Sequence, residues 1–271
     1  MGDGEDLKSL QAKNKVSEIG QFIAPFLVLG LFWEIMVRSG IANVQTLPAP
    51  SMILHELYVL IGKKGVLQCH IYHSFYRLAL GYVLAVVVGI TVGTVLALEK
   101  NLRDMFSPVL SLLISVPTIA WIPVLLITMG LGDKTVITAV FLGGVFEITY
   151  STIAGIRSVH QQQINAARIM GVKTLGLFFK VLLPGALVSI MPALRLSIGY
   201  CWRALVGGEM LSAMIKWGVG KMIYDARFWN DVRVMLVGLM VIAFFGVLLD
   251  RIMLKRLEQE TIEKWGMLVE R

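Results

Sequence analysis

Three ionisable residues lie inside long apolar stretches of the sequence, where a charge is costly. Glu147 lies near the middle of one stretch, and Arg203 and Glu209 lie together in another. Placing an ion in hydrocarbon costs on the order of 3 kcal/mol or more unless the ion is paired or hydrated. Each of these side chains therefore needs a partner, and residues of this kind often mark the path of a substrate through a membrane.

Two roles for Arg203 follow from its position. Glu147 and Arg203 lie at similar depths in their stretches, so one role is a structural ion pair between two helices. In the other role, Arg203 lines a water-filled path and attracts an anion; Gly199 and Gly207 leave space on its helix face. Glu209 follows Arg203 by six residues, so the two side chains point about 120° apart around the helix. They are therefore not natural partners within it. We take as substrate-path candidates Arg203, Glu209, Glu147 and Trp202.

The sequence contains no recognisable catalytic or nucleotide-binding motif. Gly130–Thr135, which reads GLGDKT, has Asp133 where a phosphate-binding loop needs its second glycine. Cys69, His70 and His73 are close enough on a helix to share a metal, but a metal site needs further ligands. We therefore predict no metal and no cofactor in this chain. If ATP drives the protein, a different chain binds the ATP and magnesium.

The composition is typical of a membrane protein. Of the 271 residues, 56% are hydrophobic and 16% are charged, whereas about a quarter of the residues in soluble domains are charged. The net charge of +7 does not indicate nucleic-acid binding, because the basic residues flank apolar stretches. We expect membrane lipid as a neighbour and no nucleic acid.

Six apolar stretches each have close to the ~20 residues that an α-helix needs to cross a membrane. They cover Gln21–Val37, Phe75–Leu98, Pro108–Met129, Val136–Ile156, Leu187–Ala213 and Val234–Leu254. This pattern predicts an all-α membrane protein with a tail over residues 1–20, a transmembrane domain over 21–254 and a second tail over 255–271. Lys and Arg are more frequent in the loops on the side of the two tails, so the positive-inside rule places both termini in the cytoplasm.

Further patterns predict how these helices are shaped. A small residue recurs at every fourth position over Gly81–Ala97, which allows another helix to approach closely. Pro108, Pro117 and Pro123 predict that the third stretch is bent or broken. Met52–Ile61 has apolar residues at helical spacing and predicts an interfacial helix on the outer face of the membrane.

A polar, basic segment over residues 158–184 separates the fourth and fifth stretches. It contains Asn165-Ala166-Ala167, three residues, Gly171, nine residues, and then Val181-Leu182-Leu183-Pro184. We predict a short cytoplasmic helix over Gln161–Met170 that ends at Gly171. Considered by its charge alone, such a helix would lie on anionic lipid.

The spacing of this segment resembles the EAA loop of ABC importer permeases, which reads Glu-Ala-Ala-x3-Gly-x9-Ile-x-Leu-Pro. Asn165 stands where the family has its glutamate. Further segments resemble permeases of the nitrate, sulfonate and taurine importers; they are Pro117–Thr135, Thr152–Val159 and Leu183–Leu211. The resemblance covers approximately Leu47–Leu254, and Glu147 departs from it near a position where relatives often carry Phe-Pro.

The resemblance implies a type I ABC importer in the inner membrane of a prokaryote. Such an importer contains two permease copies, two cytoplasmic ATPase chains and an extracytoplasmic solute-binding protein. In this family the EAA loop forms a coupling helix that fits a cleft in the ATPase. The expected coupling residues are therefore Asn165, Ala166, Ala167, Gly171 and Pro184. The permease itself is then not an enzyme, because ATP hydrolysis belongs to the partner chain.

The resemblance favours a small oxyanion as the substrate, with sulfonate or taurine ahead of nitrate or bicarbonate. An uncharged vitamin precursor is an alternative substrate. We expect the two permease copies to form a homodimer, with two different chains as the alternative. An alternative class is a secondary transporter or channel that needs no ATPase; it predicts inverted repeats, which the sequence does not show. A membrane enzyme is disfavoured because no catalytic constellation is recognisable.

Overall fold

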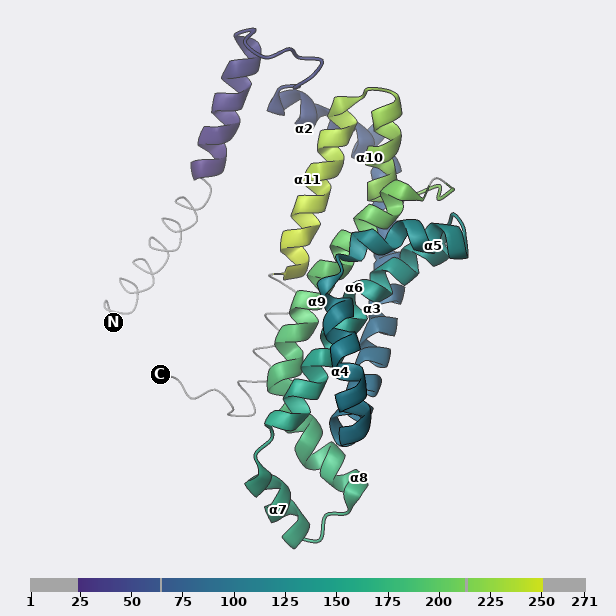
Figure 1. Ribbon diagram of the computed structural model, residues 1–271. Coiled ribbons are helices and arrows are strands. Elements are labelled where there is room, and N and C mark those ends of the chain that lie inside the picture. The colour runs from purple at the N-terminus through teal and green to yellow at the C-terminus, as the bar shows by residue number, and fades with distance from the viewer. Residues whose placement is uncertain (1–23, 64, 213, 251–271) are drawn as a thin grey trace, which may run out of the picture.

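A computed structural model of the chain describes residues 24–63, 65–212 and 214–250. These residues form helices joined by loops, and this part of the chain contains no β-strand. Figure 1 shows an elongated bundle built around three long helices, α3 (Val66–Leu98), α6 (Asp133–Ser158) and α9 (Leu183–Leu211). The predicted all-α class is confirmed. Both predicted tails, residues 1–20 and 255–271, lie outside the described residues.

Three helical segments are long and apolar enough to cross a membrane. They are Val66–Leu98, Asp133–Ser158 and Phe178–Leu211. A fourth candidate is the pair Lys100–Ser115 and Thr118–Met129, whose two halves are bent by 95°. Within the described residues the helices therefore support three spans, or four if the bent pair counts as one.

The predicted first and sixth spans correspond to shorter helices. A helix covers residues 24–38, and α11 covers Val232–Leu248. The predictions for these two spans extend into residues 21–23 and 251–254, which lie outside the described residues. The predicted count of six spans is therefore not confirmed.

The small residues of α3 pack against α6, as the sequence predicts. A Cβ atom added at Gly81 would lie 2.6 Å from Cβ of Val140, and one added at Gly93 would lie 2.6 Å from Cβ of Thr152. Ala85, between them, is fully buried. Because lipid tails are as apolar as the helices, such close contact replaces the hydrophobic effect as the force that holds the helices together.

The third predicted span is broken at one of its three prolines. α4 (Lys100–Ser115) ends before Pro117, and a short 3₁₀ turn then leads into α5 (Ile122–Met129). Val116 has an extended backbone with φ −81° and ψ 119°, as expected of a residue that precedes proline. Pro108 lies inside α4, and Pro123 lies in the first turn of α5, where a proline removes no helical hydrogen bond.

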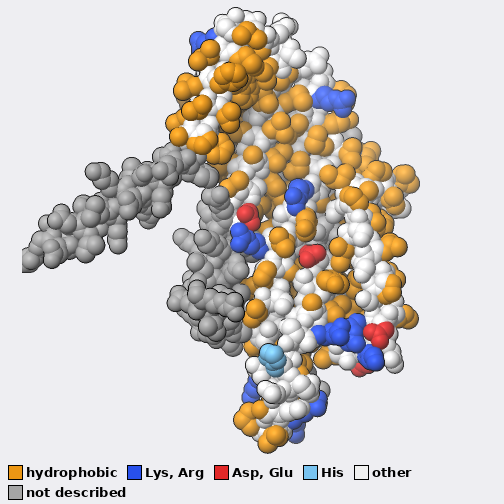
Figure 2. Space-filling model, turned by 60° about the vertical axis from the view of Figure 1, so that its left-hand side comes forward, with side chains coloured by type: hydrophobic (Ala, Val, Ile, Leu, Met, Phe, Trp, Pro, Cys, Tyr) orange, Lys and Arg blue, Asp and Glu red, His pale blue; other side chains and the backbone are white. Residues whose placement is uncertain are grey.

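The two ends of the bundle carry short helices. α2 (Pro50–Tyr58), its π-helical continuation (Val59–Lys63) and α10 (Val219–Phe228) lie at one end, and α7 (Gln161–Ile169) and α8 (Thr174–Leu177) at the other (Figure 1). The predicted helix over 52–61 corresponds to α2 and its continuation. Figure 2 shows basic side chains gathered toward the end that carries α7.

The helix over residues 24–38 is tied to α2 through Glu34. Its carboxylate accepts hydrogen bonds from the backbone amide of Ser51 at 3.0 Å and from the hydroxyl of Ser51 at 2.8 Å. Arg38 completes the contact with an ion pair of 2.6 Å to Glu34. A carboxylate from one helix thus caps the N-terminus of another, where the helix dipole favours a negative charge.

Replacing Gly93 with Ala should destabilise the bundle, because the new methyl group would push α3 away from Thr152 on α6. Overpacking of this kind costs about 1–3 kcal/mol. We expect a lower apparent Tm of the purified protein in detergent. Gly30→Ala is the matched control, because a Cβ added at Gly30 meets nothing within 4 Å. An unchanged Tm for Gly93→Ala would contradict this packing.

Candidate functional site

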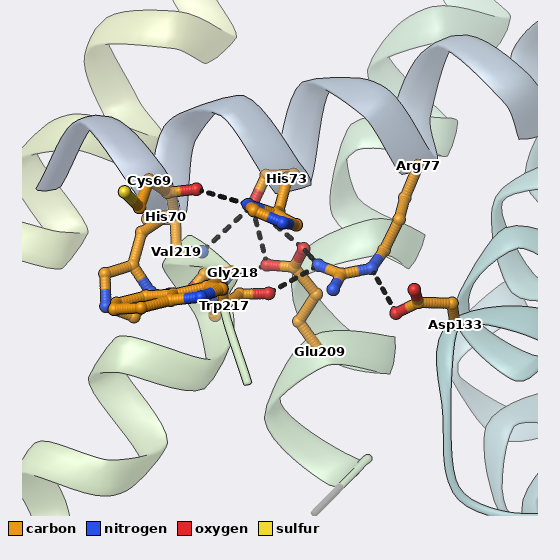
Figure 3. Close-up of polar contacts among 11 residues, drawn as sticks. Cys69, His70, His73, Arg77, Asp133, Glu209, Trp217, Gly218 and Val219 are labelled. Carbon is orange, nitrogen blue, oxygen red and sulfur yellow. Dashed lines mark hydrogen bonds and ion pairs between the residues drawn. The ribbon is translucent and has the colours of Figure 1, made fainter. Parts of the chain in front are cut away.

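A buried ion pair lies where α3, α6 and α9 meet near the end of the bundle that carries α10 (Figure 3). Glu209 of α9 is fully buried, and Arg77 of α3 is 2% exposed. Nη1 of Arg77 donates to Oε1 of Glu209 at 2.7 Å, and Nε of Arg77 donates to Oδ1 of Asp133 at 2.8 Å. Because Asp133 begins α6, one guanidinium group joins three helices.

The carboxylate of Glu209 is also satisfied by neutral donors. The hydroxyl of Ser74 lies 2.8 and 2.9 Å from its two oxygens, and the amide of Gly220 donates to Oε2 at 3.0 Å. Ser74 in turn accepts a hydrogen bond of 2.9 Å from the amide of Val219. Gly218 leaves the space for this arrangement, since a Cβ there would lie 2.6 Å from Cδ of Glu209. Buried charges are stable only with such complete pairing.

Side chains of α3 also hold the loop that connects α9 with α10. Nη1 of Arg77 donates to the carbonyl oxygen of Trp217 at 2.7 Å. Nδ1 of His70 lies 2.7 Å from the carbonyl oxygen and 3.0 Å from the amide nitrogen of Gly218. The rings of His70 and Trp217 meet edge to face at 5.0 Å. This network, centred on Arg77 and Glu209, fixes the position of α10 relative to α3.

Arg77 is a buried charged residue that the sequence pattern did not single out. The predicted second stretch begins at Phe75, which places Arg77 at its edge, where a charge needs no buried partner. α3 begins at Val66 instead, so Arg77 lies well inside the helix. The spacing of His70, Ser74 and Arg77 was the available signal, because residues four and seven positions apart share one helix face.

Trp202 and Arg203 are neighbours in the sequence but have different surroundings. Trp202 is buried, and its Nε1 donates to the carbonyl oxygen of Ile242 at 3.2 Å. Arg203 is exposed, and its Cζ lies 4.9 Å from the ring centroid of Tyr200. Both residues line a cavity of about 340 Å³ between α9 and the end of α11.

The ion pair between Glu147 and Arg203 that the sequence allowed is not formed. Glu147 lines a different cavity, of about 240 Å³, beside the break between α4 and α5. The hydroxyl of Ser151 lies 3.5 Å from Oε1 of Glu147. Within the described residues Arg203 has no carboxylate partner. Glu209 is therefore the deep carboxylate that is paired, and its partner is Arg77.

The predicted helix in the polar segment is confirmed as α7, and it ends in a defined turn. Gly171 has φ +79°, a left-handed conformation that suits glycine. The amide of Gly171 donates to the carbonyl oxygen of Arg168 at 3.0 Å. The amide of Val172 donates to the carbonyl oxygen of Ala167 at 3.1 Å. These two hydrogen bonds form a Schellman motif, which stops the helix at Met170.

α7 exposes most of its side chains at the tip of the bundle (Figure 1). Ile169 and Met170, at its C-terminal end, are 87% and 76% exposed. Asn165 and Ala166 are exposed as well, whereas Ala167 is buried and faces the bundle. An exposed apolar tip on a short polar helix is a surface that a partner protein can cover.

Pro184 has a different position from the other four coupling candidates. It is half-buried in the first turn of α9, directly after the π-helical turn Phe178–Leu182. A proline is tolerated there because the amides of the first turn have no partner within the helix. Its place in the structure suits a role in starting α9.

Glu209→Gln should destabilise the protein, because it leaves the buried guanidinium of Arg77 without its main counter-charge. Breaking a buried ion pair costs about 3–5 kcal/mol. We expect a clearly lower apparent Tm in detergent. Asp225→Asn is the matched control, because the carboxylate of Asp225, which pairs with Lys221, is about half exposed, and solvent-exposed ion pairs contribute about 0–1 kcal/mol. Equal Tm values for the two variants would show that Arg77 does not depend on Glu209.

Comparisons with known proteins identify the family of this chain. The family described as "Binding-protein-dependent transport system inner membrane component" matches residues 85–259. The chain is 31% identical over 232 residues to the taurine transport system permease protein TauC of Escherichia coli (strain K12), covering 84% of each chain. It is 30% identical over 232 residues to the nitrate import permease protein NrtB of Synechocystis sp., covering 83% of this chain and 82% of that one.

The fold is also that of a solved ABC importer. An inward-facing structure of the MetNI methionine ABC transporter matches 69% of this chain and 92% of that chain, with a TM-score of 0.60. The sequences are 20% identical, so this match concerns the fold. The family match spans α6, α7 and α9 and covers more than half of the chain. The chain therefore belongs to the family of binding-protein-dependent transport system inner membrane components, the permeases of type I ABC importers.

Proposed function

We propose that this permease imports a small organic or inorganic oxyanion that a solute-binding protein delivers to it. The observation that carries the proposal is Arg203, a guanidinium group in the middle part of α9 that is exposed and, within the described residues, unpaired with any carboxylate. A permanent positive charge at this depth attracts an anion strongly because the surroundings have a low dielectric constant. Two relatives are named for taurine and for nitrate, and both of these molecules present an oxyanion group.

The end of the bundle that carries α7 would face the cytoplasm and dock with the ATPase. The exposed basic residues near this end support that orientation under the positive-inside rule; they are Lys100, Arg157, Arg168, Lys173 and Lys180. The opposite end, with α2 and α10, would then meet the solute-binding protein. In the complete importer two copies of this chain would pair, and each α7 would contact one of two ATPase chains that hold ATP and magnesium.

α7 is well connected to the helices that line the bundle. Ile164 of α7 packs against a core cluster that contains Ala97 of α3, Ile156 of α6 and Leu182 just before α9. A movement of α7 would therefore displace the ends of α3, α6 and α9 that lie beside it. Closure of the two ATPases on ATP would in this way rock the permeases between inward-open and outward-open states.

Gly171→Val should abolish ATP-driven uptake and co-purification of the ATPase, while the permease remains in the membrane. A left-handed backbone costs an ordinary residue about 1–2 kcal/mol, so the turn after α7 would change its direction. Gly171→Asn should retain most of the uptake, because asparagine tolerates this conformation. Uptake into proteoliposomes in which the permease has a known orientation measures transport. Co-purification of the ATPase with the tagged permease measures docking.

Gly40→Val is the matched control for this experiment. Gly40 has φ +78°, and a Cβ there meets nothing within 4 Å, as at Gly171. Valine there would carry the same backbone strain, and Gly40 follows the helix over residues 24–38, which is tied to α2 at the end of the bundle opposite α7. Equal loss of ATPase binding in both variants would contradict the assignment of α7 as the docking helix.

Arg203→Gln should lower uptake of the oxyanion without lowering the amount of assembled complex. Losing a charge-assisted hydrogen bond costs about 1.5–3 kcal/mol, which corresponds to a loss of about tenfold or more in rate. Arg203→Lys should keep part of the uptake because it keeps the charge. Arg233→Gln, an exposed arginine at the start of α11, is the control. Normal uptake by Arg203→Gln would remove Arg203 from the path.

A further inference from the structure

A further cavity, of about 340 Å³, lies between α7 and the adjoining ends of α3 and α6. Gln161, Ile164 and Arg168 of α7 line it, and their spacing of three and four residues places them on one face of this helix. Asn165 and Ile169 are not among the lining residues. The cavity therefore uses a different face of α7 from the exposed tip that we assign to ATPase docking.

Two arginines from different helices line this cavity. Arg157 lies in the last turn of α6 and Arg168 in the last turn of α7, and both are exposed. No aspartate or glutamate lines the cavity. Within residues 24–63, 65–212 and 214–250 neither arginine forms an ion pair with a carboxylate. An arginine near a helix C-terminus compensates the helix dipole, but this does not explain why both positive charges border one cavity.

Most of the remaining lining is apolar and continues into the surface of α3. Leu98 and Phe178 are among the apolar lining residues. Leu98 is 54% exposed, and it shares one face of α3 with the exposed side chains of Leu84, Val88 and Val95. This face is about 21 Å long at 1.5 Å per residue, more than half of the ~30 Å hydrocarbon core. A hydrocarbon chain can therefore lie along α3 with its polar end at the cavity.

The geometry points to a binding site for an anionic phospholipid such as phosphatidylglycerol. The guanidinium groups of Arg157 and Arg168 bind the headgroup phosphate, for which the planar donors of arginine are well suited. One acyl chain lies along the exposed face of α3. Basic pockets beside membrane helices bind anionic headgroups in this way on the cytoplasmic side. A headgroup that carries an ammonium group is disfavoured, because the lining offers two positive charges and no carboxylate.

This inference goes beyond the proposed import function, because it concerns a ligand that is not transported. The lipid phosphate would bridge the last turns of α6 and α7, the two turns that carry the arginines. It would thus join the proposed docking helix to the long helices through a polar contact, in addition to the apolar packing of Ile164.

Native mass spectrometry of the full-length permease in detergent tests the site, because it counts bound lipids by mass. The probe is an equimolar mixture of phosphatidylglycerol and phosphatidylethanolamine with the same acyl chains. We expect one tightly bound phosphatidylglycerol per chain, with adducts of this lipid exceeding those of phosphatidylethanolamine by about tenfold or more. Each arginine near an anionic headgroup accounts for about fivefold of this preference. Equal adducts of the two lipids on the wild type overturn the site.

Variants show whether these two arginines carry the preference. Arg157→Gln and Arg168→Gln should each lower the ratio of the two lipids about fivefold, and binding of phosphatidylethanolamine should not change. Lys173→Gln is the matched control, because Lys173 is an exposed cation close to α7 that does not line the cavity. An equal fall in all three variants would assign the preference to the total charge of this end and overturn the site. The apparent Tm of each variant shows whether it is folded, and the wild-type comparison stands without any variant.

Two further arms distinguish a lipid from other occupants. Glycerophosphate, which has the phosphate but no acyl chains, should not displace phosphatidylglycerol at equal concentration. If it does, the site takes a soluble phosphate, and the lipid assignment fails. If single chains bind phosphatidylglycerol but dimers exclude it, a second copy covers the face of α3, and the assignment also fails. None of these measurements uses a transported oxyanion, so failure of the proposed import function would leave their result unchanged.

Discussion

The ion pair between Arg77 and Glu209 holds one end of this membrane bundle together. One guanidinium group reaches the carboxylates of Glu209 and Asp133 and the backbone of Trp217. Because a charge buried in a membrane protein must be compensated, the three long helices cannot separate there without exposing it. The loop before α10 is fixed by the same group. The remaining contacts between α3, α6 and α9 combine close packing at small residues with larger apolar side chains such as Leu78, Val140 and Leu205.

The sequence predicted the features that depend on neighbouring residues. The small-residue face of α3, the break at Pro117 and the end of α7 at Gly171 each follow from local steric rules. It failed where residues distant in the chain meet. Arg77 was not singled out because the predicted stretch begins at Phe75, whereas α3 begins at Val66, and Glu147 and Arg203 were matched by depth alone. Depth does not define which face of a helix a side chain occupies, so it could not reveal that Glu147 and Arg203 line two different cavities.

Among the deep charged residues, two kinds of environment can be distinguished. Arg77 and Glu209 are buried and satisfied by each other, by Ser74 and by backbone amides. Glu147 and Arg203 are partly or fully accessible, and their charges are not cancelled by described residues. The first kind is expected of groups that fix a structure, and the second kind of groups that meet a ligand. The cost of burying a charge thus explains both groups: Arg77 and Glu209 are buried because they are paired, and Glu147 and Arg203 remain accessible because they are not.

α9 is a continuous helix of 29 residues, about 44 Å long at 1.5 Å per residue. Its two ends are restrained differently: Glu209 fixes one end, and the other follows α7 through Leu182. α9 can therefore act as a lever whose pivot is the ion pair. A tilt of about 5° at the pivot would move the far end by about 4 Å over that length. Arg203 lies close to the pivot, so a large stroke at the α7 end would shift the guanidinium group by only a small distance.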